Sequence, residues 1–87
     1  MDPVQTVAEV LLKAIASNPD AVGIENRADG TRTTLTVTVD QADVPRMIGR
    51  KGRTINAVRT IVKAAGLKAQ RQVTLDLITP ELEDRER

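Results

Sequence analysis

The segment 46–55 holds the residues with the clearest chemical potential in this chain, because two glycines bracket two cations within it. Glycine lacks a Cβ, so Gly49 and Gly52 can turn the chain and let a polyanion approach the backbone. Between them, Arg50 offers a planar fork and Lys51 a compact charge, and both groups suit phosphate oxygens. The pattern therefore predicts a loop that grips the phosphates of a nucleic-acid backbone.

A helix is expected to begin at the second glycine, and its first turn adds another source of positive potential. The backbone N–H groups from Gly52 to Ile55 lack partners inside such a helix and lie at the positive end of its dipole. A phosphate placed there is stabilised by both effects.

Cations cluster around this segment, although the net charge of the 87-residue chain is only +1. Positions 46 to 71 contain no acid, so all 12 acids lie outside this window. One end of the molecule is therefore expected to be basic, although a solvated helix face rich in Lys and Arg gives the same pattern. The cations in the window are Arg46, Arg50, Lys51, Arg53, Arg59, Lys63, Lys68 and Arg71.

Length and composition limit the chemistry that the chain can perform. Its 87 residues suffice for one domain, and the absence of aromatic residues leaves an aliphatic core. Without cysteine or histidine, the chain forms no disulfide or thiolate metal site and has no histidine general base. The remaining hydroxyls, carboxylates and lysines show no catalytic pairing, and the loop lacks the spacing of a Walker phosphate loop. We therefore expect no enzymatic activity, cofactor or metal.

The location and assembly of the protein follow only as general expectations. No apolar run approaches the roughly 20 residues of a membrane span, and the chain begins Met1-Asp2-Pro3 without a cationic and apolar leader. This pattern predicts a cytosolic protein. A small aliphatic core often gains stability from a partner surface, which makes dimerisation an expectation from composition.

The first elements that position the loop are a helix and a β-hairpin. Asp2 as N-cap and Pro3 at the first helical position begin an amphipathic helix that is expected to end near Ser17. A short strand is predicted over 22–27, followed by a tight turn at 28–31 that contains Asp-Gly. The second arm alternates between aliphatic residues and threonine, so one face of the sheet is covered and the other is wet.

Two helices and a strand complete the predicted domain. Asp40 or Asp43 caps a short helix that leads into the loop, and capping is favoured over acid/base chemistry for both carboxylates. The helix after the loop buries a stripe, and Gly66 is expected to end it. An alternating strand covers 72–78. The buried stripe consists of Ile55, Val58, Val62 and Ala65.

The element order is helix, strand, strand, helix, helix, strand. This order predicts a two-layer α+β domain in which three helices cover one face of a three-stranded sheet. The domain is expected to span residues 1–79, followed by a charged, flexible C-terminal tail at 80–87.

The run Ile48-Gly49-Arg50-Lys51-Gly52, followed by Ile55, resembles the I-G-x-x-G-x-x-I segment of the KH domain. An additional helix and strand before the β-α-α-β core resemble its type II arrangement, over about residues 4 to 78. The size and the stretch 59–65 are similar to the small bacterial single-KH proteins called KhpA. The resemblance implies a loop that grips about four nucleotides of single-stranded RNA or DNA while the bases lie in a groove beside it.

Carried over by position, the resemblance implies a set of RNA-binding residues. Its aliphatic members Ile48 and Ile55, together with Val58, would form an apolar floor on which bases rest. For Ile55 and Val58, packing in the protein core is an equal interpretation. Because no aromatic ring can stack on a base, we expect weak binding with loose sequence preference and strong salt dependence. The implied set is Arg46, Ile48, Gly49, Arg50, Lys51, Gly52, Arg53, Ile55, Arg59 and Lys63.

The resemblance also implies a cellular role and partners. KhpA-like proteins act as RNA chaperones or post-transcriptional regulators, as homodimers or with a larger KH-containing protein. Two alternatives remain open from the residues themselves. One is a protein-protein assembly module with secondary RNA contact; the other is a helix-turn-helix that reads duplex DNA with Arg53, Asn56 and Arg59.

Overall fold

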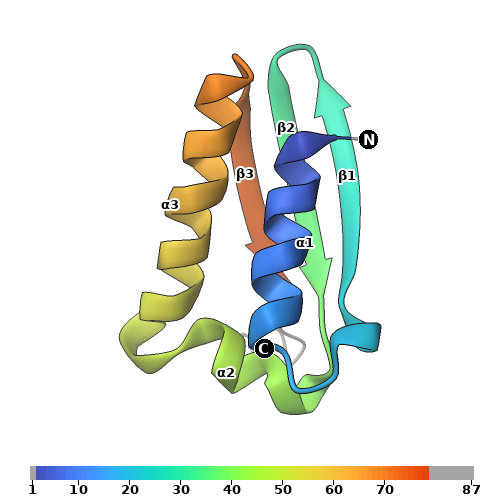
Figure 1. Ribbon diagram of the computed structural model, residues 1–87, viewed down its shortest axis with the longest axis vertical. Helices are drawn as coiled ribbons and strands as arrows, with labels where there is room; N and C mark the ends of the chain where they lie inside the picture. The colour runs from blue at the N-terminus through green and yellow to red at the C-terminus, as the bar shows by residue number, and fades with distance from the viewer. Residues whose placement is uncertain (1, 79–87) are drawn as a thin grey trace, which may run out of the picture.

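Three helices cover one face of a three-stranded sheet in the computed structural model, which describes residues 2–78 (Figure 1). The two-layer α+β architecture and the order α-β-β-α-α-β confirm the prediction, whereas the predicted tail at 80–87 lies outside the described residues. The elements are α1 (Pro3–Ile15), β1 (Gly23–Asp29), β2 (Arg32–Thr38), α2 (Val44–Ile48), α3 (Arg53–Lys68) and β3 (Gln72–Leu77), with short 3-10 turns η1 (Pro19–Ala21), η2 (Gln41–Asp43) and η3 (Arg50–Gly52).

The sheet topology places the predicted loop at one end of the molecule. Strands β1 and β2 form the expected antiparallel hairpin, closed by the pair Asp29 and Arg32, and β2 then pairs with β3 in parallel. Parallel neighbours require a crossover connection, and here it runs through α2, the loop and α3. The loop consequently lies at the end of the sheet where β2 stops, and α3 returns along the covered face (Figure 1).

The core lies between the sheet and the two longer helices. The spacing of three and four in α1 buries Val4, Ala8 and Leu12, and the alternation of β2 buries Leu35 and Val37. The buried stripe of α3 packs against α1 and β3. The buried hydrophobic residues of this cluster are Val4, Ala8, Leu12, Leu35, Val37, Met47, Ile55, Val58, Val62, Val73 and Leu75.

Asp2 caps α1 as predicted and also joins three elements. Its carboxylate accepts a bond from the Val4 N–H at 3.0 Å and another from Asn26 of β1 at 2.8 Å. Both of its oxygens also pair with the guanidinium of Arg71, which lies just before β3. The hydrogen bond from Arg71 lowers the pKa of Asp2, and the same contact raises the pKa of Arg71.

Gly66 does not end α3, so that expectation was wrong. The helix continues to Lys68, and Gly66 lies buried inside it. A Cβ at this position would lie 2.4 Å from Cγ2 of Val73, so glycine here allows α3 to approach β3 closely. The helix ends at Lys68, and Gln70, with a φ of 60°, then turns the chain so that the Arg71 N–H donates to the Gly66 carbonyl at 2.8 Å.

The two candidate capping carboxylates before α2 behave differently. Asp40 does not cap α2 but caps η2, the 3-10 turn before it, by accepting the Ala42 N–H at 3.1 Å. Asp43 stands at the N-cap position of α2, but its side chain makes no capping bond, so its predicted role was wrong. Its buried carboxylate accepts the Ser17 hydroxyl at 2.6 Å and the N–H groups of Ser17 and Asn18, each at 3.1 Å. Asp43 thus ties the connection between α1 and β1 to the helix that precedes the loop.

Candidate nucleic-acid interface

The loop between α2 and α3 takes its shape from three residues in the left-handed region of backbone space. Gly49, Lys51 and Gly52 have φ values of 75°, 55° and 76°, whereas the φ of Arg50 is not positive. Glycine adopts positive φ without steric cost, and lysine does so only with strain. The glycine spacing in the sequence is therefore the backbone requirement of this tight connection.

The two glycines serve different steric purposes. A Cβ on Gly49 would lie 2.2 Å from the Thr54 hydroxyl oxygen and 2.9 Å from the Thr54 backbone nitrogen. A Cβ on Gly52 would meet only the Asn56 side-chain nitrogen, at 3.6 Å. Gly49 thus lets the loop fold closely onto the first turn of α3, while Gly52 supplies only the turn.

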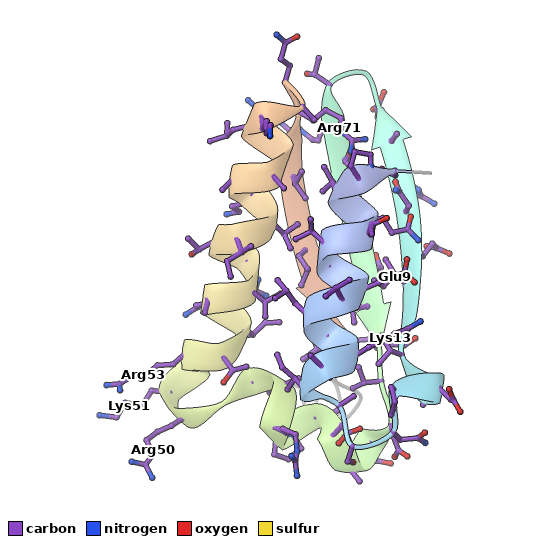
Figure 2. All side chains as sticks on the ribbon, in the orientation of Figure 1. Glu9, Lys13, Arg50, Lys51, Arg53 and Arg71 are labelled. Carbon is purple, nitrogen blue, oxygen red and sulfur yellow. The ribbon has the colours of Figure 1, made fainter. Side chains whose placement is uncertain are left out.

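The cations of the loop project from the protein surface. Arg50 and Lys51 are exposed, and Figure 2 shows both side chains, together with Arg53, pointing away from the body at the same end. The first turn of α3 follows at once, with no acidic residue to offset its dipole. These features together provide side-chain and backbone donors for a phosphate group.

The other predicted cations are held in different ways. Arg46 is exposed, and its Nε lies 4.0 Å from the Asp43 carboxylate. Arg59 is half-buried and donates through Nε to the Leu75 carbonyl of β3 at 3.0 Å, so this cation also covers part of the open edge of the sheet. Lys63 is exposed on α3.

The predicted apolar floor is mostly core. Ile55 and Val58 are buried, with 6% and 4% of their surface exposed, which favours the packing interpretation for both. Ile48 is half-buried at the end of α2, beside the loop, and keeps some surface for a ligand.

The sequence did not predict a basic hollow near the C-terminal end of α3, the end opposite to the loop. This hollow has a volume of about 380 Å³, and its lining includes Arg32, Lys63, Leu67, Arg71 and Gln72. The spacing of four between Lys63 and Leu67 places them on one face of α3. No local signal could have brought Arg32 to them, because it comes from the β1–β2 hairpin and reaches the site only through the pairing of β2 with β3.

Comparison with known proteins decides the family. The profile of the KhpA/KhpB KH domain matches residues 5–77, which include the loop, α1 from Gln5 onward and the other five main elements in full. The chain belongs to this family. That membership confirms the resemblance drawn from the loop motif and from the type II order of elements.

Several curated relatives bear the name RNA-binding protein KhpA. The chain is similar to that of Halalkalibacterium halodurans, with 35% identity over 85% of this chain and 97% of the relative. It is also similar to that of Streptococcus pneumoniae serotype 4, with 42% identity over 71% of this chain and 78% of the relative. That of Caldanaerobacter subterraneus is 33% identical over 83% of this chain and 96% of the relative. No solved structure matched the chain.

Membrane-spanning helices and metal-binding clusters are both absent from residues 2–78. Within this range, no helix has the length and apolar character needed to cross a membrane. The same part of the chain contains no group of His, Cys, Asp or Glu that could hold a metal ion.

Proposed function

We propose that this chain is a non-catalytic protein that binds single-stranded RNA, and that its loop 49–52 grips the phosphate backbone. The observation that carries the proposal is the placement of Arg50 and Lys51 at an exposed tip, between two glycines with positive φ and directly before the first turn of α3. The names of the relatives support RNA as the ligand. Arg46 and Arg53 supply additional positive charge that attracts the RNA backbone. Arg59 and Lys63 supply more of it further along α3.

The cellular role is proposed on the same basis. We infer that the protein acts in the cytoplasm as an RNA chaperone or post-transcriptional regulator. It would do so as a homodimer or with a larger KH-containing partner, because two linked sites raise a weak affinity through avidity. Two exposed aliphatic residues on the helical layer, Val10 and Ile61, support a protein partner, with 63% and 47% of their surface exposed.

The geometry favours single strands over the duplex-DNA alternative. Helix α2 has only five residues, and Arg59, one of the three candidate base-reading residues, is bonded to the Leu75 carbonyl. A recognition helix needs such side chains free to reach base edges in the major groove. Competition between single-stranded RNA and duplex DNA for one protein sample separates the two alternatives.

Charge reversal in the loop tests the proposed function. Fluorescence polarisation of a labelled single-stranded RNA is measured with the unmodified protein and with Arg50→Asp/Lys51→Asp. The control is Lys13→Asp/Arg27→Asp, which changes the net charge equally at exposed positions of α1 and β1. Far-UV circular dichroism first establishes that all three proteins are folded.

The proposal expects RNA binding to be lost only in the loop variant. Equal binding by the loop variant and the control would place the RNA site elsewhere. An unmodified protein that binds no RNA but still forms an oligomer would support the assembly module instead.

A further inference from the structure

Strand β1 is the outer strand of the sheet on the side away from α3 (Figure 1). Within residues 2–78, β1 pairs with β2 along one of its edges and with no strand along the other. The free edge of a strand presents N–H and C=O groups that can pair with a further strand. The seven residues of β1 include no proline that would interrupt such pairing.

The pairing of β2 shows which backbone groups of β1 point outward. The Ile78 N–H donates to the Val37 carbonyl at 2.9 Å, so the backbone polar groups of Val37 are directed toward β3. These directions alternate along a strand, and those of Thr36 are therefore directed toward its partner in β1, Glu25. The residues of β1 whose N–H and C=O groups point away from the sheet are consequently Ile24, Asn26 and Ala28.

The charges of β1 complement one another when two copies of the strand run antiparallel. With the two-fold axis at Asn26, Glu25 of each copy lies opposite Arg27 of the other. Both pairs then occupy non-hydrogen-bonded positions, where opposite Cα atoms are only about 4.5 Å apart and side chains contact closely. Glu25 and Arg27 are exposed, and none of the ion pairs in residues 2–78 involves either. In this register all three outward-pointing residues also find hydrogen-bond partners.

Other registers of the same pairing are less favourable. An axis at Glu25 places two glutamates opposite each other, and an axis at Arg27 opposes two arginines and sets Glu25 against Asp29. Like charges directly opposite each other destabilise a strand pair. An axis at Ile24 or Ala28 shortens the paired segment. The sequence of β1 therefore selects one register for a second copy of itself.

The centre of β1 is held in place from the helical layer. The Asn26 side chain donates to the Asp2 carboxylate at 2.8 Å and to the Gln5 side-chain oxygen at 3.0 Å. These bonds keep the Asn26 side chain on the covered face of the sheet and fix β1 against the start of α1. A strand that is already ordered loses less conformational freedom when a partner docks.

We propose that a second copy of this chain docks antiparallel on β1, so that two three-stranded sheets join into one of six strands. This inference rests on the homodimer of the proposed function and names its surface. The two-fold axis stands perpendicular to the joined sheet, so both helical layers lie on the same side and the two loops lie at opposite ends. Val10 and Ile61, on the helical layer, lie outside this strand contact.

Exchange of charges on β1 tests the docking surface with the full chain. Sedimentation equilibrium gives the dimer dissociation constant of the unmodified protein, Glu25→Arg, Arg27→Glu and the double variant Glu25→Arg/Arg27→Glu. The matched control is Lys68→Glu, which changes the net charge as Arg27→Glu does, at an exposed position of α3. Far-UV circular dichroism first establishes that every variant is folded.

The proposal expects each single exchange to raise the dissociation constant about 30-fold, because two attractive pairs become two repulsive ones. The double variant should dimerise like the unmodified protein, since every pair again joins opposite charges. An equimolar mixture of the two single variants should dimerise equally well, because one copy then carries two positive charges and the other two negative charges. The control should dimerise like the unmodified protein.

Two results would overturn the inference. Single variants that dimerise like the unmodified protein, or a mixture that does not regain the dimer, would show that copies do not pair through β1. An unmodified protein that remains a monomer throughout the concentration series would show that this edge binds no second copy.

RNA binding separates these failures from failure of the proposed function. The loop lies at the side of the sheet covered by α3, away from β1, so both single variants should bind an RNA of about four nucleotides like the unmodified protein (Figure 1). RNA binding without a dimer would refute the β1 contact alone. A charge-dependent dimer that binds no RNA would refute the RNA-binding proposal and leave the β1 contact in place.

Discussion

The two glycines of the loop should differ sharply in how they tolerate alanine. In Gly52→Ala the new methyl group meets only a side-chain atom at 3.6 Å, so the cost is the backbone strain of a left-handed alanine, about 1 kcal/mol. Gly49 has a φ of 75° and a ψ of 177°, a combination that essentially only glycine adopts, which costs about 2 kcal/mol for alanine. The contact with Thr54 at 2.2 Å adds roughly 2 kcal/mol of overpacking.

Urea unfolding followed by far-UV circular dichroism measures these costs, since the chain has no Trp or Tyr for fluorescence. We expect the free energy of unfolding to fall by about 4 kcal/mol in Gly49→Ala and about 1 kcal/mol in Gly52→Ala. In thermal melts, each 1 kcal/mol corresponds to about 4–8 °C for a domain of this size.

Gly30 of the β1–β2 turn provides the matched control. Its φ is 63°, and a Cβ at this position would have no atom within 4 Å, so Gly30→Ala should also cost about 1 kcal/mol. Equal losses for Gly49→Ala and Gly52→Ala would refute the argument that the Thr54 contact distinguishes the two positions. A larger loss in Gly30→Ala than in Gly52→Ala would show that φ alone does not set the cost.

The remaining predictions concern charge. Neutralising the loop in Arg50→Gln/Lys51→Gln should lower the salt slope of RNA affinity by about 1.4, and an unchanged slope would remove these residues from the phosphate contacts. Asp2→Asn keeps a good N-cap but loses the ion pair with Arg71, so urea unfolding at pH 7 should show a loss of about 1 kcal/mol. Hydrogen bonds to its carboxylate lower the pKa of Asp43, so its stabilising effect is complete above the unfolded pKa of about 3.9 and is lost as the pH falls through the folded value. The difference in unfolding free energy between the unmodified protein and Asp43→Asn should therefore shrink below about pH 4, and a difference independent of pH would contradict this role.

Local chemistry was sufficient to predict the order of elements and the loop. Asp2 and Pro3 mark the start of α1, and Asp29 with Gly30 marks the hairpin, because caps and tight turns depend on residues adjacent in the chain. The exposed position of Lys51 at the tip follows from the same kind of local pattern.

Features that depend on tertiary contacts were missed. Glycine is a residue type that commonly ends a helix, yet Gly66 lies inside α3 and leaves the space in which Val73 of β3 packs against the helix. Asp43 has the position of a helix cap, yet Ser17 lies close enough in space to take its carboxylate. The approach of Arg32 to α3 likewise depends on strand pairing, which no short sequence pattern reports.

The left-handed backbone of Lys51 has a consequence for evolution. Glycine or asparagine would adopt this φ of 55° with less strain, by about 1 kcal/mol for glycine. A population selected only for thermal stability should therefore replace Lys51, whereas a population selected for RNA binding should retain a cation there. Under the proposed function, the demands of folding and of RNA binding oppose each other at position 51, and sequencing after each selection would reveal which demand prevails.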